Sequence, residues 1–191
     1  ENPYGCSDKV KEVLSNTVDQ VFLYPDAAQW ALKEELSKIH NIPSDQIFVG
    51  NGSNEAIETL SRLFMSESGA KIHTQKYAFI AYKLCIRAQG IEQVESPVNE
   101  NFEPNLDHLI ESLSDKSKMI FLANPNNPTG NLIKQSTVDN LIDSVPESTL
   151  LVVDEAYDEY VKDGEYKSSI AKVKDNDNLA VLRTFSKAFG I

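Results

Sequence analysis

The sequence predicts an α/β fold with three layers (αβα), in which helices cover both faces of a mainly parallel central sheet. Two observations lead to this prediction. Short apolar segments of strand length alternate along the chain with longer segments whose apolar residues recur every three or four positions. The short segments are apolar throughout, which is typical of strands buried on both faces. Alternation of such strands with helices is the pattern of layered α/β proteins.

Five segments carry the helical spacing. Each has its apolar residues on one side, so each is expected to be a helix that buries this side. The five sets are Val10/Val13/Leu14/Val21, Ala28/Leu32/Leu36/Ile39, Ile57/Leu60/Phe64, Leu106/Leu109/Ile110/Leu113 and Val138/Leu141/Ile142/Val145. An extended arm is expected before the first helix, and a turn at Tyr24-Pro25-Asp26 before the second.

Four segments rich in β-branched and aliphatic residues are expected to form strands. They are residues 47–49, 119–122, 150–153 and 179–182. Polar clusters follow the last three directly, at residues 124–130, 154–157 and 184–187. The ligand crevice of an open α/β sheet lies beyond the carboxyl ends of its strands, so all three clusters should face one crevice.

A glycine-containing loop, Gly50-Asn51-Gly52-Ser53-Asn54-Glu55, joins the first expected strand to a helix. Its glycines allow the backbone to approach a ligand, and the free N–H groups at the helix start suit a phosphate. The same residues also suit a plain turn with a helix cap. The loop alone does not decide between the two.

Composition indicates a soluble globular chain with a small-molecule ligand. The chain has 191 residues, of which 41% are hydrophobic and 25% charged, enough for one sizeable core. Its 29 acidic and 18 basic residues give a net charge of −11, which repels nucleic acid and anionic lipid. No apolar segment reaches membrane-spanning length and no signal-like leader opens the sequence, so a cytoplasmic location is expected.

The cysteines and histidines predict neither a disulfide framework nor a metal site. Cys6 and Cys85 represent background usage and are expected to be reduced thiols. His40, His73 and His108 lie far apart, without the spacing of metal ligands.

The polar clusters together contain the groups that pyridoxal phosphate requires. This cofactor needs an amine for its aldehyde, a carboxylate for its pyridine nitrogen, donors for its O3′ atom and a phosphate cradle. Lys187 follows a buried strand and can supply the amine, which reacts once it loses its proton. Asp154 can supply the carboxylate, and Tyr157 and Asn127 can reach O3′. Phosphate donors are available from Ser53, Asn54, Thr184 and Ser186.

These segments resemble the active site of fold-type I, class I and II aminotransferases, and the opening Glu1-Asn2-Pro3-Tyr4-Gly5 favours the histidinol-phosphate aminotransferase branch. The similarity covers essentially all 191 residues. The other segments that carry it are Tyr24-Pro25-Asp26, Asn51-Gly52-Ser53-Asn54-Glu55, Asn124-Pro125-Asn126-Asn127-Pro128-Thr129-Gly130, Asp154-Glu155-Ala156-Tyr157 and Ser186-Lys187-Ala188-Phe189-Gly190.

The resemblance implies a role for each candidate residue. Lys187 would bind the cofactor covalently and move a proton between the substrate α-carbon and the cofactor C4′. Asp154 would pair with the pyridinium nitrogen, while Tyr157 and Asn127 would contact O3′.

Further positions follow from the same resemblance. Tyr77 matches the aromatic residue that stacks on the cofactor ring. Tyr24 matches a residue that reaches the phosphate in the neighbouring subunit, and Tyr4 one that closes on the substrate, which implies a homodimer with shared sites. The positions that match phosphate contacts are Ser53, Asn54, Thr184 and Ser186.

The resemblance also implies a domain organisation. Residues 1–20 would form an N-terminal arm and first helix, and residues 21–191 a large pyridoxal-phosphate-binding domain that is incomplete at its C-terminus. Family members continue to an arginine that grips the cofactor phosphate and to a small C-terminal domain that binds substrate. The chain is therefore expected to be a fragment that is inactive alone.

The implied reaction is transamination between histidinol phosphate and 2-oxoglutarate in histidine biosynthesis. An aromatic aminotransferase or a threonine-phosphate decarboxylase would share the same cofactor residues. A non-catalytic pyridoxal-phosphate-binding regulatory domain would need a DNA-binding domain upstream, and neither this domain nor a basic face appears. A lysine-only aldolase would leave Asp154 and Tyr157 without a task.

Overall fold

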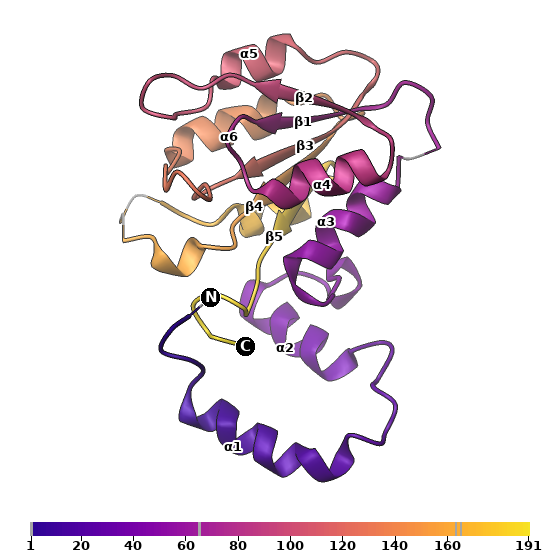
Figure 1. The fold of residues 1–191 in the computed structure, drawn as a ribbon, viewed down its shortest axis with the longest axis vertical. Coiled ribbons are helices and arrows are strands. Elements are labelled where there is room, and N and C mark those ends of the chain that lie inside the picture. The colour runs from indigo at the N-terminus through magenta and orange to yellow at the C-terminus, as the bar shows by residue number, and fades with distance from the viewer. Residues whose placement is uncertain (1, 65, 163, 165) are drawn as a thin grey trace.

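A computed structural model of the chain describes residues 2–64, 66–162, 164 and 166–191 and confirms the predicted α/β fold. Glu1, in the opening motif, lies outside the described residues. The centre of the molecule is a sheet of five parallel strands in the order β2-β1-β3-β4-β5 (Figure 1). The strands are β1 (Lys71–Gln75), β2 (Glu92–Ser96), β3 (Ser117–Ala123), β4 (Leu150–Asp154) and β5 (Leu179–Leu182).

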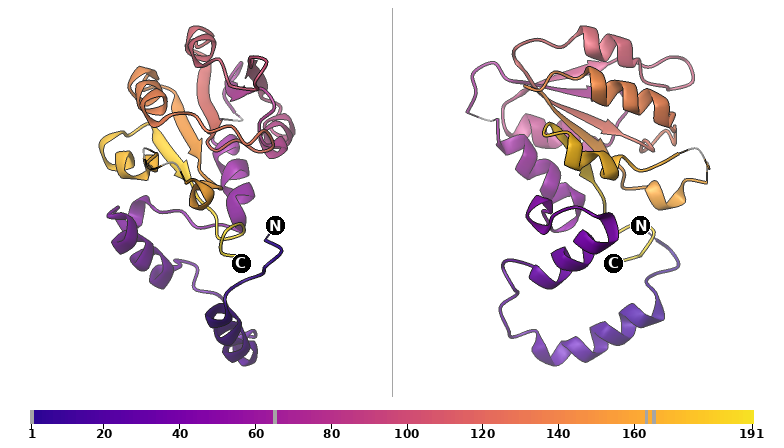
Figure 2. Two further views of the ribbon diagram at one scale, coloured as in Figure 1. Left: turned by 90° about the vertical axis from the view of Figure 1, so that its left-hand side faces the viewer. Right: turned by 180° about the vertical axis from the view of Figure 1, so that it is seen from behind.

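Helices cover both faces of the sheet and complete the three layers (Figure 2). On one face lie α3 (Gly52–Arg62) and α4 (Ile80–Ala88), and on the other lie α5 (Leu106–Glu111), α6 (Gln135–Ser144) and the 3-10 helix η4 (Ser169–Asp175).

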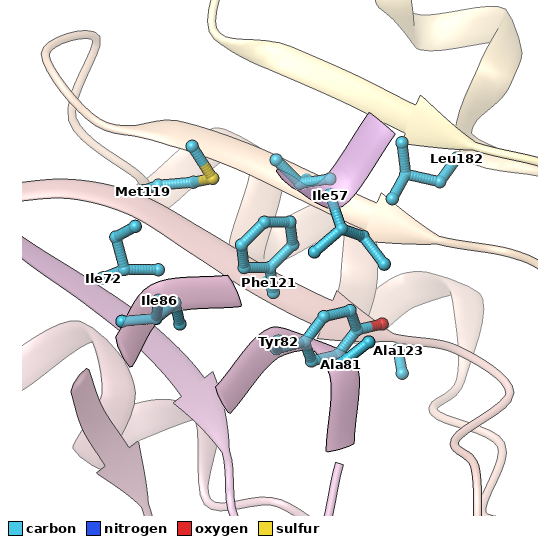
Figure 3. Packing of buried hydrophobic residues seen from close by; sticks show 10 residues of the cluster. Ile57, Ile72, Ala81, Tyr82, Ile86, Met119, Phe121, Ala123 and Leu182 are labelled. Atoms are coloured by element: carbon cyan, nitrogen blue, oxygen red, sulfur yellow. The ribbon is translucent and has the colours of Figure 1, made fainter. Parts of the chain in front are cut away.

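Successive side chains of β3 point to opposite faces and so enter two separate cores. Met119 and Phe121 belong to the core beneath α3 and α4, whereas Ile120 and Leu122 belong to the core beneath α5 and α6. Figure 3 shows the first core, with Phe121 near its centre. Each large apolar side chain buried in this way contributes about 1.5–3 kcal/mol to folding. The central strand therefore holds the layers together from both sides.

The first two predicted helices are confirmed and lie to one side of the sheet (Figure 1). The first, α1 (Asp8–Thr17), is capped by the Ser7 hydroxyl and continues into the 3-10 helix η1 (Val18–Gln20), and the second is α2 (Trp30–His40). Neither α1 nor α2 contains a buried residue, so their apolar sides are largely exposed in the part of the chain that the structure describes. Among the residues described, no helix has the length and apolar character needed to cross a membrane.

The prediction of a strand at residues 47–49 is wrong. These residues follow the 3-10 helix η2 (Ser44–Gln46) and lead to α3 without pairing to the sheet. Ile47 has extended backbone angles, φ −107° and ψ 119°, as β-branched residues favour. An extended segment becomes part of a sheet only when a neighbouring strand pairs with it, and no strand among the described residues pairs with residues 47–49.

Two strands were not expected, because they are polar. β1 carries His73, Thr74 and Gln75, all buried. His73 Nε2 lies 2.7 Å from the Ser117 hydroxyl, and the Gln75 side chain hydrogen-bonds both backbone groups of Ala123. These bonds compensate the burial of polar groups, so β1 can be central without being apolar. β2 lies at the sheet edge, where polar residues are common, and α4, which connects β1 to β2, was not expected either.

Candidate active site

A cavity of about 230 Å³ lies at the carboxyl ends of β3, β4 and β5, beside the start of α3. All three polar clusters contribute to its lining, which confirms that they face one crevice. The expected site residues that line it are Ser53, Asn54, Asn127, Asp154, Tyr157, Thr184, Ser186 and Lys187. Residues from four separate segments of the chain are thus brought together at the point where parallel strands end.

Asp154, the last residue of β4, is held from within the protein. It is 4% exposed; the Tyr82 hydroxyl donates to its Oδ2 at 2.6 Å, and the Ala156 N–H donates to its Oδ1 at 3.1 Å. Burial raises the pKa of Asp154, while the two hydrogen bonds and the charge of Lys187 limit this rise. The carboxylate therefore sits in a poorly hydrated wall, where it can bind a cationic group strongly.

Asn127 and Tyr157 form a polar pair in the same cavity. The Asn127 side-chain amide donates to the Tyr157 hydroxyl oxygen at 3.3 Å. The loop that carries Asn127 is braced by Asn126, whose N–H donates to the Asn131 carbonyl at 2.9 Å and whose side-chain amide donates to the Thr129 hydroxyl at 2.8 Å. The pair can present an amide and a phenol to one oxygen of a ligand.

Lys187 lies on the segment after β5, with its Nζ 5.9 Å from the centre of the Tyr157 ring. Residues 2–5 of the N-terminal arm pack on this segment. The Asn2 side-chain amide donates to the Ala188 carbonyl at 3.1 Å, and a Cβ on Gly190 would come within 2.5 Å of the Gly5 carbonyl oxygen. The arm thus contacts the loop that carries the lysine.

One end of the cavity offers donors for an anion. Ser53 and Asn54 lie in the first turn of α3, where backbone N–H groups have no partner within the helix. Thr184 and Ser186 also line the cavity, and the Thr184 hydroxyl donates to the Ser186 hydroxyl at 3.0 Å. Gly52, which starts α3, has a φ of +71°, a conformation that side-chain-bearing residues rarely adopt. Together, these groups form a cradle of the kind that binds phosphate.

Three expected site residues do not line the cavity. Tyr77 is 49% exposed and packs edge-on against Phe102, with ring centres 5.7 Å apart. The aromatic residues that line the cavity are Phe79, Tyr82 and Tyr157. Tyr77 lines an adjoining hollow, which Phe79, Tyr82 and Asn127 also border. Tyr4 and Tyr24 are 93% and 99% exposed and contribute nothing to the cavity within this chain.

The sequence analysis identifies neither Phe79 nor Tyr82, and both line the cavity. Tyr77, Phe79 and Tyr82 stand within six positions, and their spacing does not reveal which ring faces the cavity. In the structure, Phe79 precedes α4 and Tyr82 lies in its first turn, so that both side chains reach the cavity.

Comparison with known proteins agrees with this arrangement. The family model described as aminotransferase class I and II matches residues 1–191. Histidinol-phosphate aminotransferase 1 of Idiomarina loihiensis is 40% identical over the whole chain, which covers 52% of that protein. The chain thus spans about half the length of the curated relatives it matches.

Solved structures share the fold. The crystal structure of histidinol-phosphate aminotransferase from Sinorhizobium meliloti in complex with pyridoxal-5'-phosphate superimposes with a TM-score of 0.92 at 26% identity, covering 100% of this chain and 51% of that one. L-threonine-O-3-phosphate decarboxylase from Porphyromonas gingivalis has a TM-score of 0.82 at 23% identity, covering 100% and 55%, a likeness of fold alone. Because the family model matches residues 1–191, this chain belongs to the class I and II aminotransferases.

Proposed function

We propose that the full-length enzyme, meaning this chain continued to the length of its relatives, is a pyridoxal-phosphate-dependent aminotransferase. Its substrates would be histidinol phosphate and 2-oxoglutarate, and it would act in histidine biosynthesis. Its location would be the cytoplasm. The observation that carries this proposal is the meeting of Lys187, Asp154, Asn127 and Tyr157 in one cavity with an anion cradle. The substrate follows from the names of the relatives, which are 36–40% identical.

The residues present fit the cofactor. Asp154 is a buried carboxyl group whose anion could hold the proton on the pyridine nitrogen, and its orientation is already set by two hydrogen bonds. The Asn127 amide and the Tyr157 phenol can donate to O3′. Phe79 can form an aromatic wall beside the ring. The phosphate would lie at the start of α3, where the cradle offers Ser53, Asn54, Thr184 and Ser186.

When bound, pyridoxal phosphate supplies an electron-accepting ring that stabilises negative charge at the substrate α-carbon. The chain supplies binding and proton transfer. Lys187 Nζ would hold the cofactor at its aldehyde and, once displaced by the substrate amine, would move the proton between the substrate α-carbon and the cofactor C4′. Asp154 would keep the ring nitrogen protonated, which would increase the electron-withdrawing power of the ring.

The domain organisation and the subunit arrangement belong to the same proposal. Residues 1–20 would act as an arm and residues 21–191 as the large domain, with a small domain supplied by the rest of the full-length enzyme. The exposed apolar sides of α1 and α2, and the exposed Tyr4 and Tyr24, suit contacts with the small domain and with a second subunit. In a homodimer, Tyr24 would reach the partner subunit's phosphate site and Tyr4 would close on substrate.

The test is the visible absorption of the full-length enzyme with pyridoxal phosphate, before and after histidinol phosphate is added. We expect a band of protein-bound cofactor that shifts when the substrate arrives and returns when 2-oxoglutarate is added. A band that does not change when histidinol phosphate is added would support the cofactor assignment but exclude this substrate. Aromatic amino acids and threonine phosphate would then be tested. Failure to bind the cofactor would contradict the proposal as a whole.

A further inference from the structure

Tyr82 is a buried phenol that has no task in the proposed reaction. It is 1% exposed and lies on α4, yet its hydroxyl donates to Asp154 Oδ2 at 2.6 Å, across 72 positions of sequence. Asp154 Oδ1 accepts from the Ala156 N–H. Among the described residues, Tyr82 is the one side chain that donates a hydrogen bond to this carboxylate. Both carboxylate oxygens are therefore held from inside the protein.

The Tyr82 ring is locked in place by two other aromatic rings. It stacks on Phe121 with ring centres 4.8 Å apart and planes 4° apart, and meets Phe79 edge-on at 5.9 Å and 88°. Figure 3 shows this ring beside Phe121, with its hydroxyl toward the end of β3 at Ala123. Because the ring is held in this way, its hydroxyl oxygen is fixed in position. The hydrogen bond to Asp154 therefore forms without a further loss of side-chain conformational entropy.

The protonation state of Tyr82 allows its hydroxyl to act as a hydrogen-bond donor throughout the working pH range. Burial and the neighbouring charge of Asp154 raise the pKa of the phenol well above its usual value, so it stays protonated at any working pH. The other titratable groups that act on this pair are Lys187, whose positive charge favours the Asp154 anion, and Tyr157. A donor to a buried carboxylate stabilises its ionised form against the penalty of burial.

We propose that Tyr82 is a positioning residue of the active site. Its hydroxyl fixes the orientation of Asp154 and stabilises the carboxylate as an anion, so that the shared proton stays on the pyridine nitrogen of the bound cofactor. The proposal rests on the proposed function, because it assigns Asp154 to that nitrogen. The alternative is that the bond merely satisfies a buried phenol.

The experiment uses the full-length enzyme loaded with pyridoxal phosphate labelled with nitrogen-15 in its ring. Tyr82→Phe removes the hydroxyl and keeps the ring on Phe121, and Tyr160→Phe, at an exposed tyrosine outside the cavity, is the matched control. The first readout is the nitrogen-15 NMR shift of the bound cofactor. The second is the single-turnover rate with histidinol phosphate, in the natural enzyme and in an Asp154→Asn background. Thermal unfolding checks that each variant is folded.

We expect Tyr82→Phe to move the nitrogen shift toward that of a neutral pyridine. The single-turnover rate should fall about 10- to 100-fold, the range expected for one hydrogen bond to a charged group. In the Asp154→Asn background, the same change should cost less than about threefold, because the charge on which the hydroxyl acts is gone. Tyr160→Phe should change neither readout.

An unchanged nitrogen shift together with an equal rate loss in both backgrounds would overturn the proposal and leave Tyr82 with a packing role. Borohydride reduction followed by mass spectrometry separates this result from failure of the proposed function. Cofactor trapped on Lys187 without coupling between Tyr82 and Asp154 refutes only the role of Tyr82. An enzyme that traps no cofactor refutes both.

Discussion

Replacing Gly52 by alanine should weaken the binding of pyridoxal phosphate while leaving every donor of the cavity in place. Gly52 has a φ of +71°, and the nearest described atom to an added Cβ, apart from its chain neighbours and the backbone of α3, is the Ser186 hydroxyl oxygen at 4.0 Å. The methyl group has room, so the cost is conformational and amounts to about 1–2 kcal/mol for a side chain in the left-handed region. If the free loop relaxes and the phosphate must restore it, the dissociation constant rises about 5- to 30-fold.

Gly90 provides the matched control for this prediction. It follows α4 and has a φ of +69°, and apart from its chain neighbours no described residue lies within 4 Å of an added Cβ. Gly90→Ala therefore carries a similar conformational cost outside the cavity. Both variants of the full-length enzyme would be stripped of cofactor and titrated with pyridoxal phosphate, with binding followed by absorption. The reasoning is refuted if Gly52→Ala binds the cofactor as tightly as the unmodified enzyme, or if Gly90→Ala weakens binding to the same extent.

Four further predictions follow from the site and the core. Lys187→Ala should abolish turnover and borohydride trapping of the cofactor, and near-normal turnover would exclude Lys187 as the reactive amine. Asp154→Asn should keep the cofactor bound but slow the single-turnover rate by about 100-fold or more; an unaffected rate would contradict its role at the ring nitrogen. Phe79→Leu should weaken cofactor binding about two- to tenfold through loss of an aromatic contact, while Tyr77→Leu should have little effect; the reverse order in a titration would restore Tyr77 as the stacking residue. Burial lowers the pKa of His73, so the folded protein keeps this side chain neutral. The free energy of unfolding should therefore decline as the pH falls below about 6.5, where the unfolded chain gains the proton. Urea midpoints measured from pH 8 to 5 should fall less steeply for His73→Asn than for the unmodified protein, and parallel curves would show that another group dominates.

The sequence was informative where burial and chemistry are both local. β3, β4 and β5 are largely apolar and end at Ala123, Asp154 and Leu182, where polar residues begin or follow. A continuous apolar run followed by polar residues therefore marks both the strand and the site. Parallel strands all end on one side of a sheet, which is why their polar clusters could be placed together before any contact was known.

The same reasoning failed where a partner far along the chain decides the structure. β1 is buried and polar because Ser117 and Ala123 of β3 satisfy its side chains. The segment at residues 47–49 has strand-like residues, but none of the strands that the structure describes pairs with it. A short stretch of sequence shows whether a segment favours a helix or a strand. It does not show which distant residues will pair with that segment in the fold.

The sequence alone therefore determined the α/β class, the family and the set of chemical groups at the site, since these depend on residue type, order and spacing. Only the tertiary structure decided that Phe79 lines the cavity in place of Tyr77, and that Tyr82 holds Asp154. The physical reason is that the direction of a side chain is set by the packing of α4 on the sheet. A bond between residues 72 positions apart exists only once that packing has formed.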